Sequence, residues 1–222
     1  MCGRFTLRSI DRIRLALGNR INLEYVPPRY NIAPSQPVIT VIENHVEEVT
    51  WGLIPNWSKE PKAIINARAE TLETRASFKE SFEKRRCLIL ADGFYEWRRV
   101  GRSKQAFFFQ MKDSHAFAFA GIWDKWRRGE IPIMTCAMIT TDANEVLSPV
   151  HDRMPVILHE DHYELWLDPK VPPTELKKLL EPYPSEEMKS HPVGSQVNYP
   201  DVDKQELIER VDVEVGTTPS LF

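Results

Sequence analysis

The middle of the chain is dominated by short apolar segments that are typical of β-strands and that have no regular helices between them. Five such segments lie between residues 87 and 141: CLILA, FYEW, AFFFQM, AFAFAGIW and IPIMTCAMITT. Folds built from βαβ units alternate the two kinds of element along the chain, and this order does not. The segments therefore predict an α+β fold, with a curved antiparallel sheet or open barrel and short peripheral helices.

Helical and hairpin patterns surround this central region. Residues 9–19 have an amphipathic pattern that places Ile10, Ile13 and Leu17 on one face. Asn44 lies between two strand-like runs within residues 38–52 and predicts the turn of a hairpin. Further helices are predicted at residues 69–85, 142–147, 160–167 and 173–180.

We expect a single domain, because the 222 residues contain neither an internal repeat nor a low-complexity linker. Hydrophobic residues make up 42% of the chain and charged residues 27%, a composition that excludes an intrinsically disordered protein. The predicted domain covers residues 1–200. The acidic tail at 201–222 is predicted to be peripheral.

Cysteine usage and apolar run length indicate an intracellular protein. Cys2, Cys87 and Cys136 are odd in number, far apart and without a CxxC pair, which argues against a disulfide framework and a structural zinc site. The scattered histidines complete no ligand set with them, so we expect no metal and no other cofactor. Since the chain has no long apolar run and no signal-peptide pattern, we expect it in the cytoplasm, without membrane contact.

Charge is distributed unevenly along the chain. Residues 1–130 hold 22 Lys/Arg and 15 Asp/Glu, a net charge of +7, whereas residues 131–222 hold 7 and 17, a net charge of −10. A basic half is able to bind a polyanion even when the whole molecule is slightly acidic. Mutual neutralisation of the two halves within one domain explains the same pattern equally well.

Cys2 is the first candidate for chemistry, because removal of Met1 would leave a thiol and a free amine on one residue. The amine, with a pKa of about 7.7–8.0, is partly neutral at pH 7, and a thiol near 8.5 is a strong nucleophile once ionised. An aldehyde condenses with such an amine to an imine, and the thiol then closes a five-membered thiazolidine. The alternative is a small buried hydrophobic residue.

Three further segments carry polar groups in defined positions. In INARAET, strand alternation places Asn66 and Arg68 on the same face. In DGFYEW, Glu96 shares a face with Phe94, and a carboxyl group among aromatic rings has a raised pKa that suits a general acid. In VHDRMP, His151 is the acid/base candidate. The structural alternatives are a Glu paired with an Arg and a histidine satisfied within the fold.

An arginine follows each of these candidates by two residues. The pairs are Cys2/Arg4, Asn66/Arg68, Glu96/Arg98 and His151/Arg153. Residues two apart in an extended strand lie about 6.5–7 Å apart on one face. The same strand edges therefore offer reactive groups and bidentate phosphate ligands, with Arg98 the weakest member of the set.

Aromatic residues near the prolines suggest a stacking platform for unpaired bases. Trp57, which follows Pro55 in a turn-like segment, is the tryptophan that we expect to be exposed. Core positions are predicted for Trp51, Trp123, Trp126 and Trp166. The basic clusters EKRRC and WRRVGRSK are interpreted as solvated surface.

In this order, the segments MCGRF, YNIAP, WGLIPNW, INARAET, DGFYEW, FAGIW and VHDRMP resemble the SRAP (SOS response-associated peptidase) family. The resemblance covers roughly residues 1–200. It implies a protein that binds single-stranded DNA, including single-to-double-strand junctions, and crosslinks to abasic sites. It also implies loss of Met1 by autoproteolysis, possible lyase activity and association with the nucleoid when DNA is bound; we expect a monomer.

The resemblance assigns a role to each candidate residue. Cys2 would form the thiazolidine, Asn66 would position the amine and the sugar, Glu96 would open the deoxyribose and handle the imine proton, and His151 would act on the sugar oxygen. The implied DNA contacts are Arg4, Arg68 and Arg153 to phosphates, and Trp57, Trp97, Pro34, Pro155 and Asn31 to the backbone or flanking bases. For Trp97, strand alternation points away from Glu96.

Two other functions fit the same residues. An N-terminal-nucleophile amidohydrolase or thiol peptidase would use Cys2 with its own amine or His151 as base. Such a hydrolase would release many products per chain and would need no DNA. A non-covalent single-strand binder would lose affinity steeply with salt and show no preference for an abasic sugar.

Overall fold

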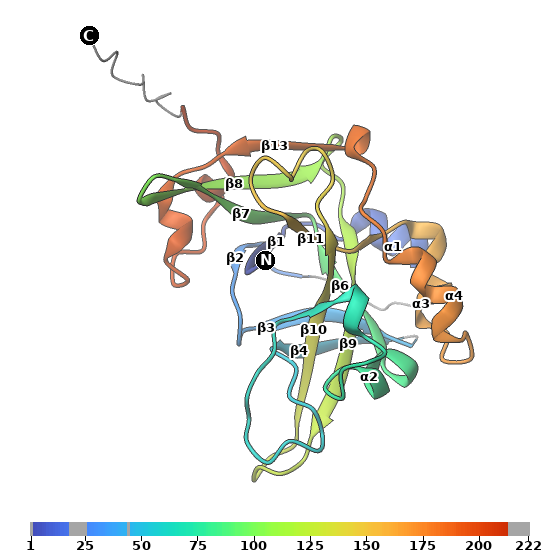
Figure 1. The fold of residues 1–222 in the computed structure, drawn as a ribbon. Coiled ribbons are helices and arrows are strands. Elements are labelled where there is room, and N and C mark those ends of the chain that lie inside the picture. The colour runs from blue at the N-terminus through green and yellow to red at the C-terminus, as the bar shows by residue number, and fades with distance from the viewer. Residues whose placement is uncertain (1, 18–25, 44, 213–222) are drawn as a thin grey trace.

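The computed structural model describes residues 2–17, 26–43 and 45–212. Two β-sheets form most of the molecule, and short helices lie at their periphery (Figure 1). The fold is therefore α+β and the domain is single, as the sequence predicts. Each helix in the described part of the chain is too short or too polar to span a bilayer.

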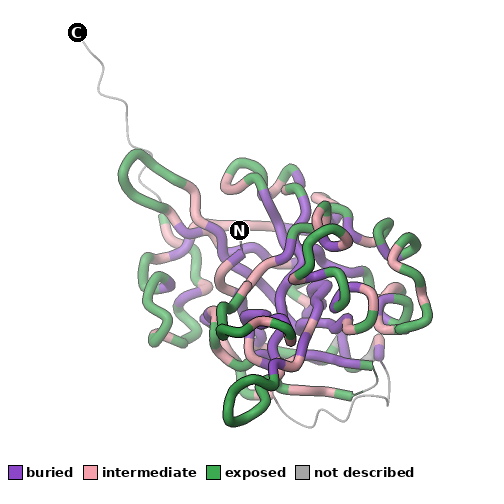
Figure 2. The backbone as a smooth tube through the Cα atoms, turned by 60° about the horizontal axis from the view of Figure 1, so that its bottom comes forward, coloured by how far each residue is buried: buried purple, intermediate pink, exposed green. Residues whose placement is uncertain are grey.

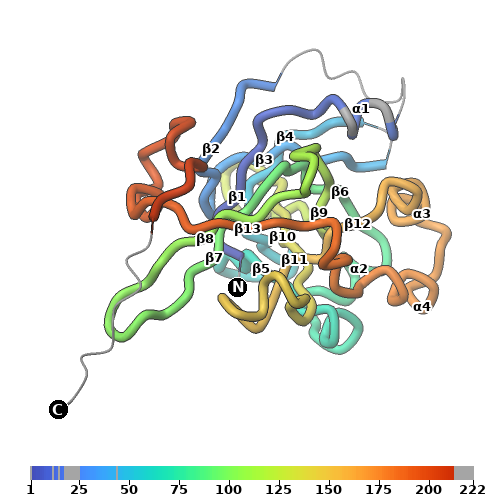
Figure 3. Tube along the Cα trace, turned by 90° about the horizontal axis from the view of Figure 1, so that it is seen from above, coloured from blue at the N-terminus to red at the C-terminus, as the bar shows by residue number. Residues whose placement is uncertain are grey.

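The first sheet has five strands in the order β13-β8-β7-β1-β2, and every neighbouring pair is antiparallel. Its strands are β1 (Arg4–Leu7), β2 (Arg29–Ile32), β7 (Gly93–Val100), β8 (Ser103–Met111) and β13 (Met188–Pro192). Strands β7 and β8 form a long hairpin that projects beyond the body of the molecule (Figure 3).

The second sheet closes into a ring, because β9 pairs with both β6 and β10. Its strands are β3 (Pro37–Ile42), β4 (His45–Trp51), β5 (Asn66–Arg68), β6 (Arg86–Ala91), β9 (Phe117–Trp126), β10 (Ile133–Asp142), β11 (Arg153–Pro155) and β12 (Ile157–Leu158). Strand β10 pairs in parallel with β4 and β5. This ring closure and the parallel pairs are details that the strand pattern did not predict.

The helices are shorter than the sequence patterns. The α-helices are α1 (Asp11–Leu17), α2 (Lys79–Lys84), α3 (Tyr163–Leu167) and α4 (Pro173–Leu176). The 3-10 helices are Ala69–Thr71, Glu160–His162, Lys177–Leu179, Ser185–Glu187, Ser195–Asn198 and Gln205–Ile208. The predicted helices at 9–19, 160–167 and 173–180 are confirmed within the described residues, and so are the strands of the 38–52 hairpin. Residues 18, 19 and 44 lie outside the described residues.

Two helix predictions were wrong. The single helix expected at 69–85 is divided into the 3-10 helix Ala69–Thr71 and α2, because Leu72 and Phe78 are both buried but six residues apart, a spacing that one α-helix would place on different faces. The helix expected at 142–147 is a series of turns, in which the Asn144 side-chain oxygen accepts the backbone N–H of Leu147 at 3.1 Å.

The core follows the alternation of the strands. Buried residues are concentrated in the strands inside the molecule, and exposed residues in the connections around them (Figure 2). Phe94 packs in the main core whereas Tyr95, the next residue of β7, packs in a smaller cluster on the opposite face. Trp51, Trp126 and Trp166 are buried, and Trp123 is partly buried against the main core, in agreement with the predicted core positions.

The segment that follows β13 covers the edge strand β2. The Asp203 carboxylate accepts the backbone N–H groups of Tyr30 and Asn31 at 2.5 and 3.1 Å, and it pairs with Arg29. Leu207 is buried in the smaller cluster. Asp203 and Leu207 therefore attach this segment to the sheet, although most of residues 201–212 are exposed or partly exposed. Residues 213–222 of the predicted tail lie outside the described residues.

Candidate functional site

Strand β1 places Cys2 beside the strand that carries Glu96. Arg4 pairs with Tyr95 in the antiparallel register of β1 and β7, so the chain that precedes Arg4 runs alongside the residue that follows Tyr95. The Cys2 side chain is fully buried, and its thiol donates to the Arg4 carbonyl at 3.5 Å. Cys2 and Glu96 thus lie close together although 94 positions separate them in the sequence.

Asn66 binds the backbone of Cys2 directly. Its Nδ2 group donates to the Cys2 carbonyl at 2.8 Å, and β5 holds it opposite Met138 on β10. The Oδ1 atom of Asn66 is buried and has no hydrogen-bond partner among the described residues. An unused buried acceptor is costly, so this atom is available to a donor brought by a ligand.

Glu96 is a buried carboxyl group, with only 2% of its surface exposed. Burial raises its pKa, and neighbouring positive charge, including that of His151, opposes the increase. Burial likewise raises the pKa of the Cys2 thiol, and the charge of Glu96 raises it further. The thiol is therefore neutral near pH 7, and its ionisation requires a proton acceptor in the site.

His151 is held at the end of a turn, where its backbone N–H donates to the Leu147 carbonyl at 3.0 Å. Its Nδ1 atom accepts the backbone N–H of Arg153 at 3.0 Å and lies 2.9 Å from an Asp152 carboxylate oxygen. In the neutral ring, acceptance from Arg153 places the proton on Nε2, whereas the protonated ring pairs with Asp152. His151 is only partly buried, so its ring is accessible to solvent or a ligand.

The structure thus brings the four candidate catalytic residues together from four separate parts of the chain. A thiol, an amide with a spare acceptor, a carboxyl group of raised pKa and an imidazole lie in one site. Such a set provides a nucleophile with proton donors and acceptors around it.

Comparison with known proteins identifies the family. The profile that matches residues 1–200 is described as SOS response associated peptidase (SRAP). The chain belongs to the SRAP family. Abasic site processing protein YoqW of Bacillus subtilis (strain 168) is 43% identical, over 94% of this chain and 99% of that protein.

More distant SRAP relatives also align along most of the chain. Abasic site processing protein YedK of Escherichia coli (strain K12) is 30% identical over 95% of this chain and 100% of that protein. Abasic site processing protein HMCES of Gallus gallus is 35% identical over 85% of this chain and 67% of its own length. A crystal structure of a Bacteroides thetaiotaomicron protein has a TM-score of 0.85 at 25% identity, covering 95% of this chain and 100% of that one.

The expected DNA contacts of this SRAP chain divide into exposed and internal residues. Trp57 is 52% exposed, as predicted, and Arg68 is exposed at the end of β5. Pro34 is partly buried. Trp97 is partly buried on the face away from Phe94, and its indole N–H donates to Asn198 Oδ1 at 2.8 Å.

Two of the expected phosphate ligands bind the protein itself. Arg4 donates to Asn31 Oδ1 at 3.1 Å and to the Val197 carbonyl at 2.5 Å. Arg153 forms a bidentate pair with Glu70 at 2.7 and 3.0 Å and a further ion pair with Asp142 at 2.6 Å. In this conformation, a phosphate would have to replace one of these internal partners.

Asn31 and Pro155, two further expected DNA contacts, are buried in this conformation. The Asn31 side chain has no exposed surface, because its Nδ2 donates to the carbonyls of Tyr199 and Val202 at 2.9 and 2.8 Å. Pro155 is buried in β11, where it pairs with Thr140. Asn31 also accepts a hydrogen bond from Arg4, and Pro155 lies in the same strand as Arg153. Their direct contact with DNA stays a prediction.

Sequence reasoning missed Asp92, which fixes the N-terminal strand. Its buried carboxylate accepts the Thr6 hydroxyl and the backbone N–H of Arg8, both at 2.5 Å, and the backbone N–H of Ser9 at 3.2 Å. The Arg8 guanidinium lies 3.1 Å away. The available signal was an isolated acidic residue within the apolar run CLILADGF, which requires partners when buried.

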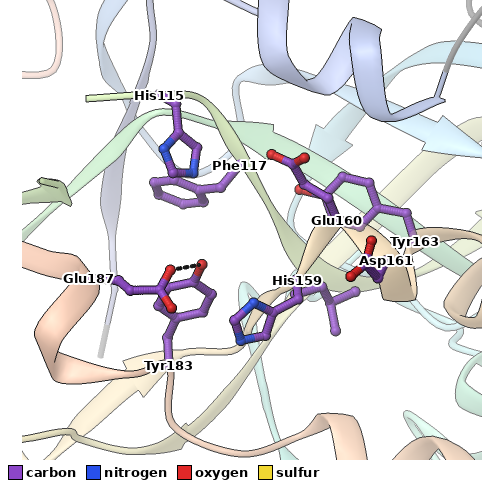
Figure 4. A pocket seen from close by; sticks show the side chains of 9 residues that line it. His115, Phe117, His159, Glu160, Asp161, Tyr163, Tyr183 and Glu187 are labelled. Atoms are coloured by element: carbon purple, nitrogen blue, oxygen red, sulfur yellow. Dashed lines mark hydrogen bonds between the residues drawn. The ribbon is translucent and has the colours of Figure 1, made fainter. Parts of the chain in front are cut away.

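A separate cavity of about 240 Å³ lies between β9 and residues 158–187 (Figure 4). His115 and Phe117 line one side, and Tyr183 stacks on His159 with ring centroids 4.6 Å apart. None of the four candidate catalytic residues lines it. Within residues 2–17, 26–43 and 45–212, no group of three or more His, Cys, Asp or Glu residues is arranged to hold a metal ion.

Proposed function

We propose that this SRAP protein captures abasic sites in single-stranded DNA through a covalent bond to Cys2 and thereby shields the lesion. The observation that carries the proposal is the position of Cys2. Its thiol is buried near the carboxyl group of Glu96, and its backbone carbonyl accepts a hydrogen bond from Asn66. The relatives named abasic site processing protein support the substrate class.

The reaction begins with removal of Met1, which frees the α-amine of Cys2. The amine adds to the C1′ aldehyde of the ring-opened abasic sugar, and loss of water gives an imine. The Cys2 sulfur then bonds to the imine carbon while the thiol proton passes to the imine nitrogen, which closes a thiazolidine. Aldehyde and aminothiol thus give a thiazolidine and one water, and neither oxidant nor metal is needed.

The site residues serve the proton transfers in this sequence. Because burial keeps the Cys2 thiol neutral, its attack requires an acceptor, and burial also raises the pKa of Glu96 towards the range where it exchanges protons. Asn66 holds the Cys2 backbone and offers its free Oδ1 to the amine. In this proposal, His151 protonates the sugar oxygen as the ring opens.

The partner in this proposal is an unpaired strand, also where it meets a duplex. Arg68 is an exposed cation at the edge of the site, and Trp57 offers an exposed ring for stacking on a base. Arg4 and Arg153 would join them as phosphate ligands if DNA displaced their internal partners. One protein molecule suffices for every step, and the protein acts as a monomer.

The test is incubation with an abasic single-stranded oligonucleotide, followed by denaturing electrophoresis and intact mass measurement. We expect an adduct whose mass is the chain without Met1 plus the oligonucleotide less one water. Cys2→Ala should abolish the stable adduct, whereas Cys136→Ala, which alters another fully buried thiol, should retain it. Full adduct yield from Cys2→Ala would overturn the thiazolidine assignment, and multiple turnover without DNA would indicate a hydrolase.

A further inference from the structure

The turn of the β7–β8 hairpin, residues 99–104, is a basic segment at the end of the two strands. All six residues are exposed, and the sequence contains no acidic residue between positions 97 and 112. Arg99, Arg102 and Lys104 form no ion pair or side-chain hydrogen bond with any described residue. We call this segment the basic tip.

The register of the hairpin places two of these positive charges opposite each other. Arg99 on β7 lies directly opposite Lys104 on β8, and like charges in such a cross-strand position destabilise a hairpin. The neighbouring Arg98 differs, because its guanidinium packs over the Phe107 ring at 4.8 Å. Arg4 and Arg153 likewise have internal partners. The basic tip is thus a repulsive cluster that an external anion would stabilise.

The position of the basic tip relative to the candidate site suggests which anion it binds. Glu96 and Arg99 lie on the same strand, and at about 3.3 Å per residue they are roughly 10 Å apart along the backbone, with the turn at Gly101 roughly 16 Å from Glu96. Strand alternation places the Arg99 side chain on the face of Trp97, an expected DNA contact, and not on the face of Glu96. Figures 1 and 3 show this hairpin leaving the body of the molecule on the side opposite α3 and α4. A nucleic-acid strand advances about 3.4 Å per nucleotide in a duplex and further when stretched, so the tip reaches at most about three to five nucleotides from the site.

We infer that the basic tip binds the backbone phosphates of DNA beside the captured sugar. The inference rests on the proposed function, because it takes the position of the lesion from Cys2 and Glu96. Arg99 and Arg102 are the principal ligands, since their guanidinium groups fit phosphate oxygens, and Lys104 adds a third charge. The shared chemistry is a phosphate backbone, which either an unpaired flank or a duplex arm supplies.

The experiment compares Arg99→Gln/Arg102→Gln with a control of equal charge change, Lys170→Gln/Lys178→Gln. The two control lysines are exposed on the α3–α4 side of the molecule, away from the hairpin. Crosslinking rates are measured with subsaturating protein on three abasic substrates. One has a single nucleotide on each side of the lesion, one has long unpaired flanks, and one has a duplex arm starting near the lesion.

We expect the tip variant to react more slowly with the flanked substrates and at the wild-type rate with the short one. Affinity for DNA falls with salt, and the steepness is the slope of the logarithm of the binding constant against the logarithm of the salt concentration. Loss of two phosphate contacts reduces the magnitude of this slope by about 1.4 on an unpaired flank and by about 1.8 on a duplex. Wild-type affinity would then fall about 7-fold more than that of the variant between 50 and 200 mM salt on an unpaired flank. The substrate that shows the larger loss identifies which flank binds.

Unchanged rates on both flanked substrates would overturn the inference, and so would an equal loss in the lysine control. A slower reaction on the short substrate would also contradict it, because the tip cannot reach that DNA. Failure of wild-type protein to crosslink any of the three substrates would instead refute the proposed function. The two failures are therefore distinguishable.

Discussion

Truncation of Asp92 tests whether its carboxylate anchors the N-terminal strand. Asp92 is 2% exposed, and it accepts hydrogen bonds from Thr6, Arg8 and Ser9 while pairing with the Arg8 guanidinium. Breaking a buried pair by removing one partner costs about 3–5 kcal/mol. Because the Arg8 side chain is 20% exposed, we expect Asp92→Ala to lower the free energy of unfolding by about 3 kcal/mol.

Urea unfolding at neutral pH measures this loss, and Asp201→Ala is the control because Asp201 is exposed. For a chain of this length, a loss of 3 kcal/mol corresponds to a fall in Tm of about 6–12 °C. Asp92→Asn keeps the shape but turns an amide donor towards other donors, so we expect an intermediate loss. If Asp92→Ala were within about 1 kcal/mol of the control, the carboxylate would not be the anchor that its contacts indicate.

Two further predictions concern the site and its DNA surface. Burial raises the pKa of Glu96, so its ionised form destabilises the fold and the wild type loses stability as pH rises above the ordinary value of 4.5 through the raised one. Urea unfolding should therefore show Glu96→Gln to be more stable than wild type at pH 8 but not at pH 4. Its crosslinking rate should be about 10²- to 10⁴-fold lower. A gain in stability that did not depend on pH would contradict the burial of an ionisable carboxyl group at this position. Trp57→Ala should weaken binding to single-stranded DNA by about 1–3 kcal/mol in a fluorescence titration, because a stacked base is lost. Its Tm should stay within about 2 °C of wild type, since half of the ring is exposed, and unchanged affinity would exclude Trp57 from the DNA surface.

Local patterns predicted the elements better than their arrangement. The five central strands alternate or run apolar and are rich in aromatic and β-branched residues, so their existence and approximate bounds followed from the sequence. The closed ring depends on β9 pairing with two partners and on β4 meeting β10 in parallel, contacts between residues as far apart as Trp51 and Cys136. Such pairings cannot be read from a local segment, because the hydrophobic pattern of a strand is the same whichever strand lies beside it in the sheet.

The candidate site residues could be chosen by their type, but the interactions of the neighbouring arginines could not be predicted. Alternation in β7 correctly placed Glu96 on the face of Phe94, and the pKa of a carboxyl buried there is raised as expected. The arginines show the limit of a spacing argument. Arg4 and Arg153 follow their candidates by two residues as Arg68 does, yet Val197, Glu70 and Asp142 bind them from distant parts of the chain.

Dispersal of the site over the fold explains how a buried thiol is kept both protected and usable. Cys2 precedes β1, Asn66 begins β5, Glu96 lies within β7 and His151 follows a turn after β10, so no local segment contains two of them. Burial in the folded chain holds the thiol protonated, which limits its reaction with small electrophiles in solution. The same folding places Glu96 beside it, so a proton acceptor is present only where the thiol is also shielded. Under the proposed function, the fold would therefore restrict Cys2 to a partner that enters the site and brings its own carbonyl to it.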